Sequence, residues 1–106
     1  MCPPVQSEDC LYLNVYTPDK PAPEGGWPVY VFIHGGAFQN GAAGSFAYVG
    51  FGFATTDIVL VAMNYRLGAF GFLTYKDIAG NFGFQDQIRA MEWVQEVSYY
   101  YDKCCY

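Results

Sequence analysis

The segment best suited to chemistry is a glycine turn that follows a buried apolar run. Val29–Ile33 is a continuous run of β-branched and aromatic residues, and His34-Gly35-Gly36-Ala37 comes directly after it. A strand that enters such a turn leaves successive backbone N–H groups unpaired, and small residues let a carbonyl group approach them. These donors suit the oxyanion formed in acyl transfer, where one donor is worth about 3–4 kcal/mol. The alternative is an ordinary turn after a strand.

The residues that would complete an acyl-transfer site are not found at suitable spacings. The three serines, Ser7, Ser45 and Ser98, lack glycines two residues before and after, so none lies on a G-x-S-x-G nucleophile turn. The single histidine, His34, follows a strand and is better explained by packing than by proton transfer. Since an oxyanion-binding turn has no attacking group of its own, we assign no catalytic residue.

Two apolar runs predict the strands that hold this turn. Val29–Ile33 and Ile58–Met63 are apolar on both faces, which is typical of a parallel sheet covered by helices. Leu11–Thr17 alternates and stops before Pro18, which predicts another strand. The stretch between the two apolar runs is long enough for a crossover that contains a short helix near Ala47–Ala54.

A later segment predicts an amphipathic helix. Its buried face is expected to hold the apolar residues that recur at helical spacing, namely Phe84, Ile88, Met91 and Val94. This helix is expected to be roughly 13 residues long and to end near Glu96. The order of strands and helices predicts an α/β fold with a mostly parallel sheet and crossover helices.

Composition and charge narrow the functional classes. Of 106 residues, 53% are hydrophobic and 20% aromatic, which favours a piece of a larger core and argues against disorder. The net charge is −5 and the basic residues are scattered, so we expect no nucleic-acid binding. No apolar run reaches the ~18 residues of a membrane span. We also expect no signal peptide, because the N-terminus lacks a basic and an apolar region.

Metal binding is not expected either. The four cysteines form no C-x-x-C pair and His34 is the only histidine, so we predict no zinc site and no cofactor. Cys2 and Cys10 are close enough in sequence for a disulfide, and free thiols are an equal alternative.

Ordered blocks of the sequence resemble the carboxylesterase type-B (cholinesterase-like) family. The blocks are Ser7–Pro18, Pro28–Gly36, Asn64–Leu73 and Gly80–Gln87, followed by a helix at Ala90–Glu96. The resemblance covers most of the chain and implies an α/β-hydrolase fold. It also implies an activity on carboxylic esters with a serine nucleophile.

By position, the resemblance implies that the backbone N–H groups of Gly36 and Ala37 are oxyanion-hole donors. Gly35 would be the hinge that directs them. The family usually has glycine where Ala37 stands, and alanine keeps the donor. Arg66 and Asp86 resemble a family ion pair that ties a strand end to the following helix, a role that is architectural rather than catalytic.

The resemblance also divides the chain. The family's nucleophile turn lies beyond the helix that ends near Glu96, so residues 1–96 resemble the N-terminal part of the domain, truncated before that turn. Residues 97–106 show no resemblance and form an unrelated tail. Cys10 resembles the second cysteine of the family's first disulfide, whose usual partner lies upstream. Val29–Ile33 is central in the family's sheet, so its uncovered edge is expected to need a partner or to aggregate.

The resemblance therefore implies a fragment of a carboxylic ester hydrolase that carries an oxyanion hole and is inactive alone. Its partners would be a small-molecule ester and a complementing chain that supplies the missing residues. An alternative is a non-catalytic cholinesterase-like binding or adhesion module. Another is a small enzyme, or one half of a two-chain enzyme. Full-length relatives are mostly secreted or lumenal.

Overall fold

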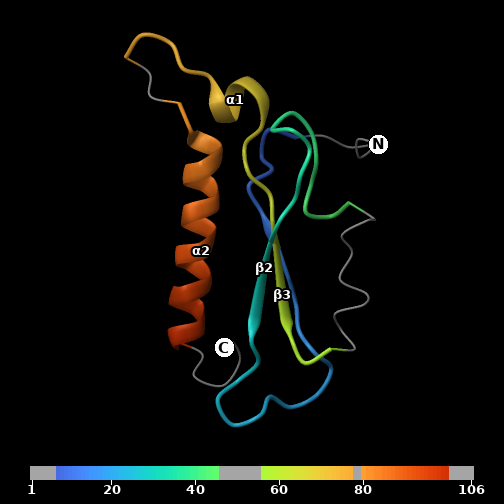
Figure 1. Cartoon of the computed structure of the whole chain (residues 1–106). Coiled ribbons are helices and arrows are strands. Elements are labelled where there is room, and N and C mark those ends of the chain that lie inside the picture. Colours follow the sequence, from blue (N-terminus) through green and yellow to red (C-terminus); the bar gives the residue numbers. More distant parts are fainter. Residues whose placement is uncertain (1–6, 46–55, 78–79, 101–106) are drawn as a thin grey trace.

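The strands and the long helix follow the predicted order in a computed structural model, which describes residues 7–45, 56–77 and 80–100. The elements are β1 (Leu13–Tyr16), β2 (Val29–Ile33), β3 (Val59–Met63), α1 (Gly68–Phe72) and α2 (Phe82–Tyr100) (Figure 1). The strands predicted from the two apolar runs are confirmed as β2 and β3. The short helix predicted near Ala47–Ala54 lies outside the described residues.

The sheet is mixed rather than mostly parallel, which corrects the prediction from sequence. Its strand order is β1-β3-β2, and β3 pairs parallel with β2 but antiparallel with β1. The two apolar runs do pair in parallel, as their composition indicates. The direction of β1 is not encoded in its pattern, because alternation along a strand reports which face is buried and not which way the strand runs.

Strand β3 is the centre of the core. Each of its residues is at most 3% exposed, because β3 has a neighbour on both edges. Trp27, Val59 and Val61 form a buried cluster, against which Leu13 and Val94 pack. The described core therefore joins the sheet to α2.

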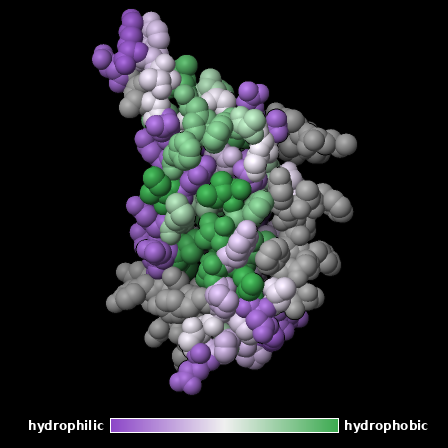
Figure 2. Space-filling model, viewed as in Figure 1, coloured by the Kyte–Doolittle hydropathy of each residue, from purple (hydrophilic) through white to green (hydrophobic). Residues whose placement is uncertain are grey.

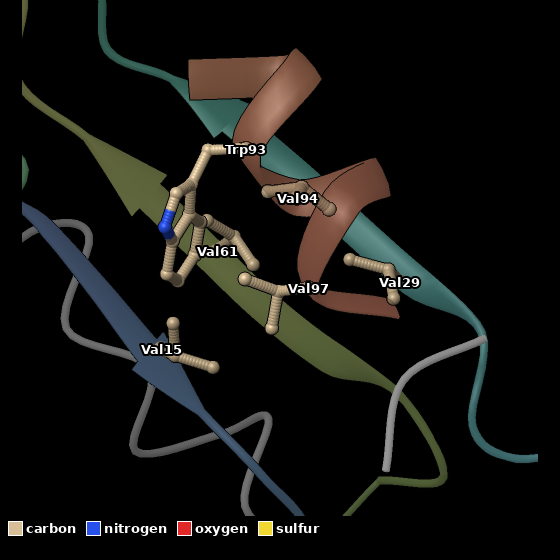
Figure 3. A pocket seen from close by; sticks show the side chains of 6 residues that line it. All are labelled: Val15, Val29, Val61, Trp93, Val94 and Val97. Carbon is tan, nitrogen blue, oxygen red and sulfur yellow. The ribbon is translucent and has the colours of Figure 1, made fainter. Parts of the chain in front are cut away.

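A small apolar cavity remains where α2 meets the sheet. Figure 3 shows the side chains that converge on it from all three strands and the helix, namely Val15, Val29, Val61, Trp93, Val94 and Val97. Its volume is about 30 Å³, which is room for about one water molecule. The cavity is a packing gap and is too small for an organic ligand.

Helix α2 buries a different face from the one predicted. The helix lies along one face of the sheet (Figure 1). Phe84, Ile88 and Met91 are 45%, 51% and 41% exposed, and only Val94 of the predicted face packs against the core cluster. The three-stranded sheet is too narrow to cover the whole apolar stripe of the helix.

Helix α2 is also longer than predicted. It spans 19 residues and continues through the boundary expected near Glu96. No glycine or proline follows Gly83 within the helix to stop it, and the sequence signals that end helices are mainly of that kind. The helix thus extends into the part of the chain that showed no family resemblance.

Strand β2 lies at one edge of the described sheet. The N–H of Val59 on β3 donates to the carbonyl oxygen of Pro28 at 2.9 Å. Because alternate residues of a strand point their main-chain groups to opposite sides, those of Val29, Val31 and Ile33 face away from β3. Figure 2 shows apolar surface gathered between this strand and α2. Such an edge is a template for pairing with another strand.

We expect the isolated chain to self-associate through this edge and Ile33→Lys to weaken that association. The side chains of Tyr30 and Ile33 are 49% and 40% exposed, and a lysine on an edge strand opposes strand pairing. Sedimentation velocity should show an association constant lower by about tenfold, which corresponds to ~1.4 kcal/mol. Leu11→Lys is the control, because Leu11 is 50% exposed but lies outside the strands. Equal effects of the two substitutions would contradict the prediction.

Candidate functional site

The turn after β2 has a left-handed backbone over several residues. Gly36, Ala37 and Phe38 have φ angles of 130°, 51° and 61°. The N–H groups of Gln39 and Asn40 donate to the carbonyl oxygen of Gly36 at 3.0 and 3.2 Å. A left-handed conformation costs a non-glycine residue roughly 1–2 kcal/mol. Two such residues in succession therefore persist only where surrounding contacts hold them.

The two predicted donors, the N–H groups of Gly36 and Ala37, belong to this turn. In the described part of the chain, neither group donates to a backbone oxygen. Gly36 is half-buried and Ala37 is exposed. Successive N–H groups in a turn of this kind can form a concave site for an anion. Within the described residues, these two N–H groups therefore have no backbone acceptor.

The two glycines of the turn differ in the space around them. A Cβ atom on Gly36 would collide with the carbonyl oxygen of Asn40, and its φ is positive as well. A Cβ on Gly35 would meet no atom within 4 Å. The turn therefore requires glycine at Gly36 and not at Gly35, a distinction that the sequence motif does not contain.

His34 is packed beneath the turn. Its side chain is 2% exposed, and its ring stacks on that of Tyr65, with ring centroids 4.6 Å apart. Its Nδ1 lies 2.8 Å from the carbonyl oxygen of Gly35, a distance at which an Nδ1–H donates to that oxygen. These contacts agree with the packing role expected for a histidine at a strand end.

The segment that follows β3 lies at the same end of the sheet as the turn (Figure 1). The Oδ1 of Asn64 accepts the N–H of Ala43 at 2.8 Å, and its Nδ2 donates to the carbonyl oxygen of Cys10 at 2.9 Å. The backbone N–H of Asn64 donates to the carbonyl oxygen of Tyr12. One side chain thus ties the end of the turn to the segment before β1.

Sequence reasoning did not single out Asn64 or Tyr65 as site residues. The signal that identifies them is their place directly after the second apolar run. The carboxyl ends of neighbouring parallel strands meet at one edge of a sheet, so polar residues there lie near the glycine turn.

Arg66 and Asp86 form a two-pronged ion pair between this segment and α2. The Nη2 and Nε of Arg66 donate to the two carboxylate oxygens at 2.7 and 2.8 Å, and its backbone N–H donates at 3.0 Å. Burial of the Asp86 carboxylate acts to raise its pKa. The hydrogen bonds from Arg66, with its positive charge, outweigh that effect and lower the pKa of Asp86. The pair holds the loop after β3 against the first turns of α2.

Known proteins are similar to this chain in sequence. A family model described as the carboxylesterase family matches residues 2–98. The chain belongs to the carboxylesterase family. The resemblance noted from the sequence blocks is thereby confirmed.

Several carboxylesterase-family relatives are much longer than this chain. It is 50% identical to a Crystal protein of Dictyostelium discoideum over 90 residues, which are 85% of this chain and 16% of that protein. It is 49% identical to an acetylcholinesterase of Danio rerio over 96 residues, 87% of this chain and 15% of the relative. It is 46% identical to a para-nitrobenzyl esterase of Bacillus subtilis over 98 residues, 88% of this chain and 20% of the relative. The chain thus spans a fifth or less of their length.

Solved carboxylesterase-family structures share the described architecture. A thermophilic PNB esterase superposes with a TM-score of 0.74 and 41% identity, over 86% of this chain and 20% of that chain. A second PNB esterase gives the same TM-score and identity over 91% and 22%. These neighbours have the α/β-hydrolase fold, and this chain corresponds to a small part of it with a mixed sheet.

The other candidate side chains of this carboxylesterase-family chain are those of the metal-ligating residue types, the thiols and the serines. Among the described residues, no group of three or more His, Cys, Asp and Glu side chains could hold a metal ion. Cys10 is a free, half-buried thiol, while Cys2 lies outside the described residues. Ser7 is exposed and Ser45 is half-buried.

No helix in the described ranges is long and apolar enough to cross a membrane.

Proposed function

We propose that this chain supplies the oxyanion hole of a carboxylic ester hydrolase, with the N–H groups of Gly36 and Ala37 as donors. The observation that carries the proposal is the left-handed turn after β2, in which neither N–H donates to a backbone oxygen of the described residues. Gly35 acts as the hinge that leads into the donors. Donors held in this way stabilise the charge that develops on the ester carbonyl oxygen more than they stabilise the neutral ester.

The 106 residues do not hydrolyse esters by themselves. Ser7, Ser45 and Ser98 all lie outside a G-x-S-x-G turn. His34 is buried and stacked on Tyr65, so it is not placed to activate a serine. Without an activated nucleophile no acyl-enzyme forms, and the donors have no oxyanion to bind.

A complete site needs residues from the remainder of the family's domain. They come from the same polypeptide or from a complementing chain. The open edge of β2 and the exposed stripe Phe84, Ile88 and Met91 are the apolar surfaces on which that remainder would pack. The substrate of the completed site is a small-molecule ester.

The first test measures the chain alone. The purified 106-residue chain should neither hydrolyse p-nitrophenyl acetate nor react with a fluorophosphonate that labels activated serines. Labelling of Ser45 or Ser98 together with turnover would contradict the proposed inactivity.

The second test restores the rest of the domain. Residues 2–98 replace the matched segment of the Bacillus subtilis para-nitrobenzyl esterase, to which the chain is 46% identical. We expect the chimera to hydrolyse p-nitrophenyl acetate, because the turn then lies in a complete site. A chimera that unfolds as cooperatively as its parent but does not turn over would contradict the proposed oxyanion hole.

A further inference from the structure

We propose that Tyr65 is a positioning residue that holds the Gly36–Ala37 turn from the neighbouring strand end, acting through His34. The inference rests on the function proposed above, since it concerns the loop that carries the two donors. The contacts that Tyr65 makes with the turn point to this role.

Strand pairing brings Tyr65 under the turn. β2 and β3 run in parallel with Ile33 opposite Met63, so the turn and Tyr65 leave the sheet at the same end. Tyr65 is 5% exposed. Its hydroxyl donates to the carbonyl oxygen of His34 at 2.8 Å, and its ring stacks on the His34 ring at an interplanar angle of 23°. Tyr65 therefore contacts both the backbone and the side chain of the residue that begins the turn.

The segment that contains Tyr65 also contacts the turn at Phe38. The backbone N–H of Gly68 donates to the carbonyl oxygen of Phe38 at 2.6 Å. The Phe38 ring contacts the rings of Phe72 and Phe84, at centroid distances of 4.9 and 6.0 Å. The turn is thus bracketed by a hydrogen bond at each end, and Gly35 lies between the two bonds together with both residues that carry the proposed donors.

The His34 ring also lies against the chain that returns at Gly41. A Cβ atom on Gly41, whose φ is 128°, would collide with the imidazole Nδ1, so the returning chain lies directly against the ring. Asn64, the residue before Tyr65, accepts the N–H of Ala43 and fixes that returning segment. His34 therefore contacts Tyr65 through its ring face and lies against Gly41 through Nδ1.

This arrangement makes the direction of the donors depend on the Tyr65 hydroxyl. The His34–Gly35 peptide group is the one whose carbonyl the hydroxyl binds, and its orientation sets where the following N–H groups point. Ala37 and Phe38 are left-handed without being glycine, so they return to ordinary conformations when an anchor is lost. Removing the hydroxyl should therefore release the turn before it disturbs the sheet.

The test compares Tyr65→Phe with Tyr75→Phe in the full 106-residue chain, isotopically labelled for NMR. Tyr65→Phe keeps the ring and removes only the hydroxyl, while Tyr75 is 57% exposed and serves as the matched control. The readouts are the strong intraresidue HN–Hα NOE of the left-handed Ala37 and Phe38, and hydrogen exchange of the Gly68 amide. We expect Tyr65→Phe to lose the NOEs and to speed Gly68 exchange by at least about tenfold.

Hydrogen exchange of the Val61 amide, in the centre of the sheet, serves as the reference for exchange of the Gly68 amide. Release of the turn with unchanged Val61 exchange supports a positioning role. Equal acceleration at Val61 and Gly68 overturns it, because Tyr65 would then only stabilise the fold. Unchanged NOEs and exchange in Tyr65→Phe overturn it as well. Tyr75→Phe should resemble the unsubstituted chain.

The inference and the proposed function fail separately. The NMR readouts need no ester and no nucleophile, so they report only how the turn is held. If Tyr65→Phe releases the turn but the esterase chimera is folded and inactive, the donors lack the proposed function and Tyr65 still positions the loop. If the chimera is active and Tyr65→Phe leaves the turn unchanged, only the role of Tyr65 is wrong.

Discussion

In the esterase chimera that contains residues 2–98, Gly36→Ala lowers kcat by about 10²–10³-fold, the loss seen when one oxyanion donor is removed. The added Cβ would collide with the carbonyl oxygen of Asn40, and φ at this position is 130°. The turn must then rearrange, which redirects the N–H groups of Gly36 and Ala37. Because these donors act on the charge that develops in the transition state, we expect kcat to fall far more than KM changes.

Gly44→Ala is the matched control, since it makes the same chemical change later in the same loop and outside the proposed oxyanion hole. No atom lies within 4 Å of a Cβ at Gly44 and its φ is not positive, so the turn keeps its shape and kcat stays close to that of the unsubstituted chimera. Steady-state kinetics with p-nitrophenyl acetate provide the measurement. Equal losses in the two variants would show that bulk near the turn, and not the direction of the donors, limits the reaction.

Asp86→Asn is expected to destabilise the chain by about 2 kcal/mol. Removing one partner of a buried pair typically costs about 3–5 kcal/mol. The cost is smaller here because the Arg66 side chain is 37% exposed and partly solvated, while the Asp86 side chain is only 10% exposed. The Arg66 guanidinium and backbone N–H would both lose a charged acceptor. Urea unfolding followed by tryptophan fluorescence measures the change.

A second, exposed ion pair on α2 controls for the loss of charge alone. Arg89 lies 3.2 Å from Glu92 and Glu96, and these three side chains are 67%, 56% and 55% exposed. Arg89→Gln should therefore leave the urea midpoint of unfolding almost unchanged, because exposed ion pairs contribute little to stability. An effect as large as that of Asp86→Asn would contradict the view that partial burial makes the Arg66–Asp86 pair important.

The Asp86 effect should also depend on pH in one direction. Because Arg66 lowers the pKa of Asp86 in the folded chain, the unfolded chain binds the proton more readily. The contribution of the pair is therefore complete above the unfolded pKa of about 3.9 and is lost as the pH falls through the folded pKa. The stability difference between the unsubstituted chain and Asp86→Asn should stay constant from about pH 7 to about pH 5 and shrink below about pH 4. A difference that grew on acidification would contradict the assignment.

Much of this protein follows from short-range sequence signals. The apolar run Val29–Ile33 is a strand because β-branched and aromatic residues suit a buried sheet, and the glycines after it end the strand. The second run, β3, is equally clear. The ordered blocks around these runs were sufficient to identify the carboxylesterase family, which residues 2–98 match.

Other features depend on contacts between residues that are distant in sequence. The apolar spacing of α2 predicted a helix, but the width of the sheet decided that Phe84, Ile88 and Met91 stay exposed. The antiparallel direction of β1 likewise comes from its pairing with β3. Periodicity along one segment contains no information about the element that covers it.

The candidate site likewise combines features set by the local sequence with features set by long-range contacts. The sequence determined that small residues follow a buried strand at Gly35 and Gly36. Only the tertiary structure decided which glycine has no room for a side chain, and that Ala37 is left-handed. The hydrogen bonds that hold the turn join residues 31 and 21 positions apart, from Tyr65 to His34 and from Ala43 to Asn64. Local propensity opposes the left-handed state of Ala37, so these long-range bonds determine the shape of the turn.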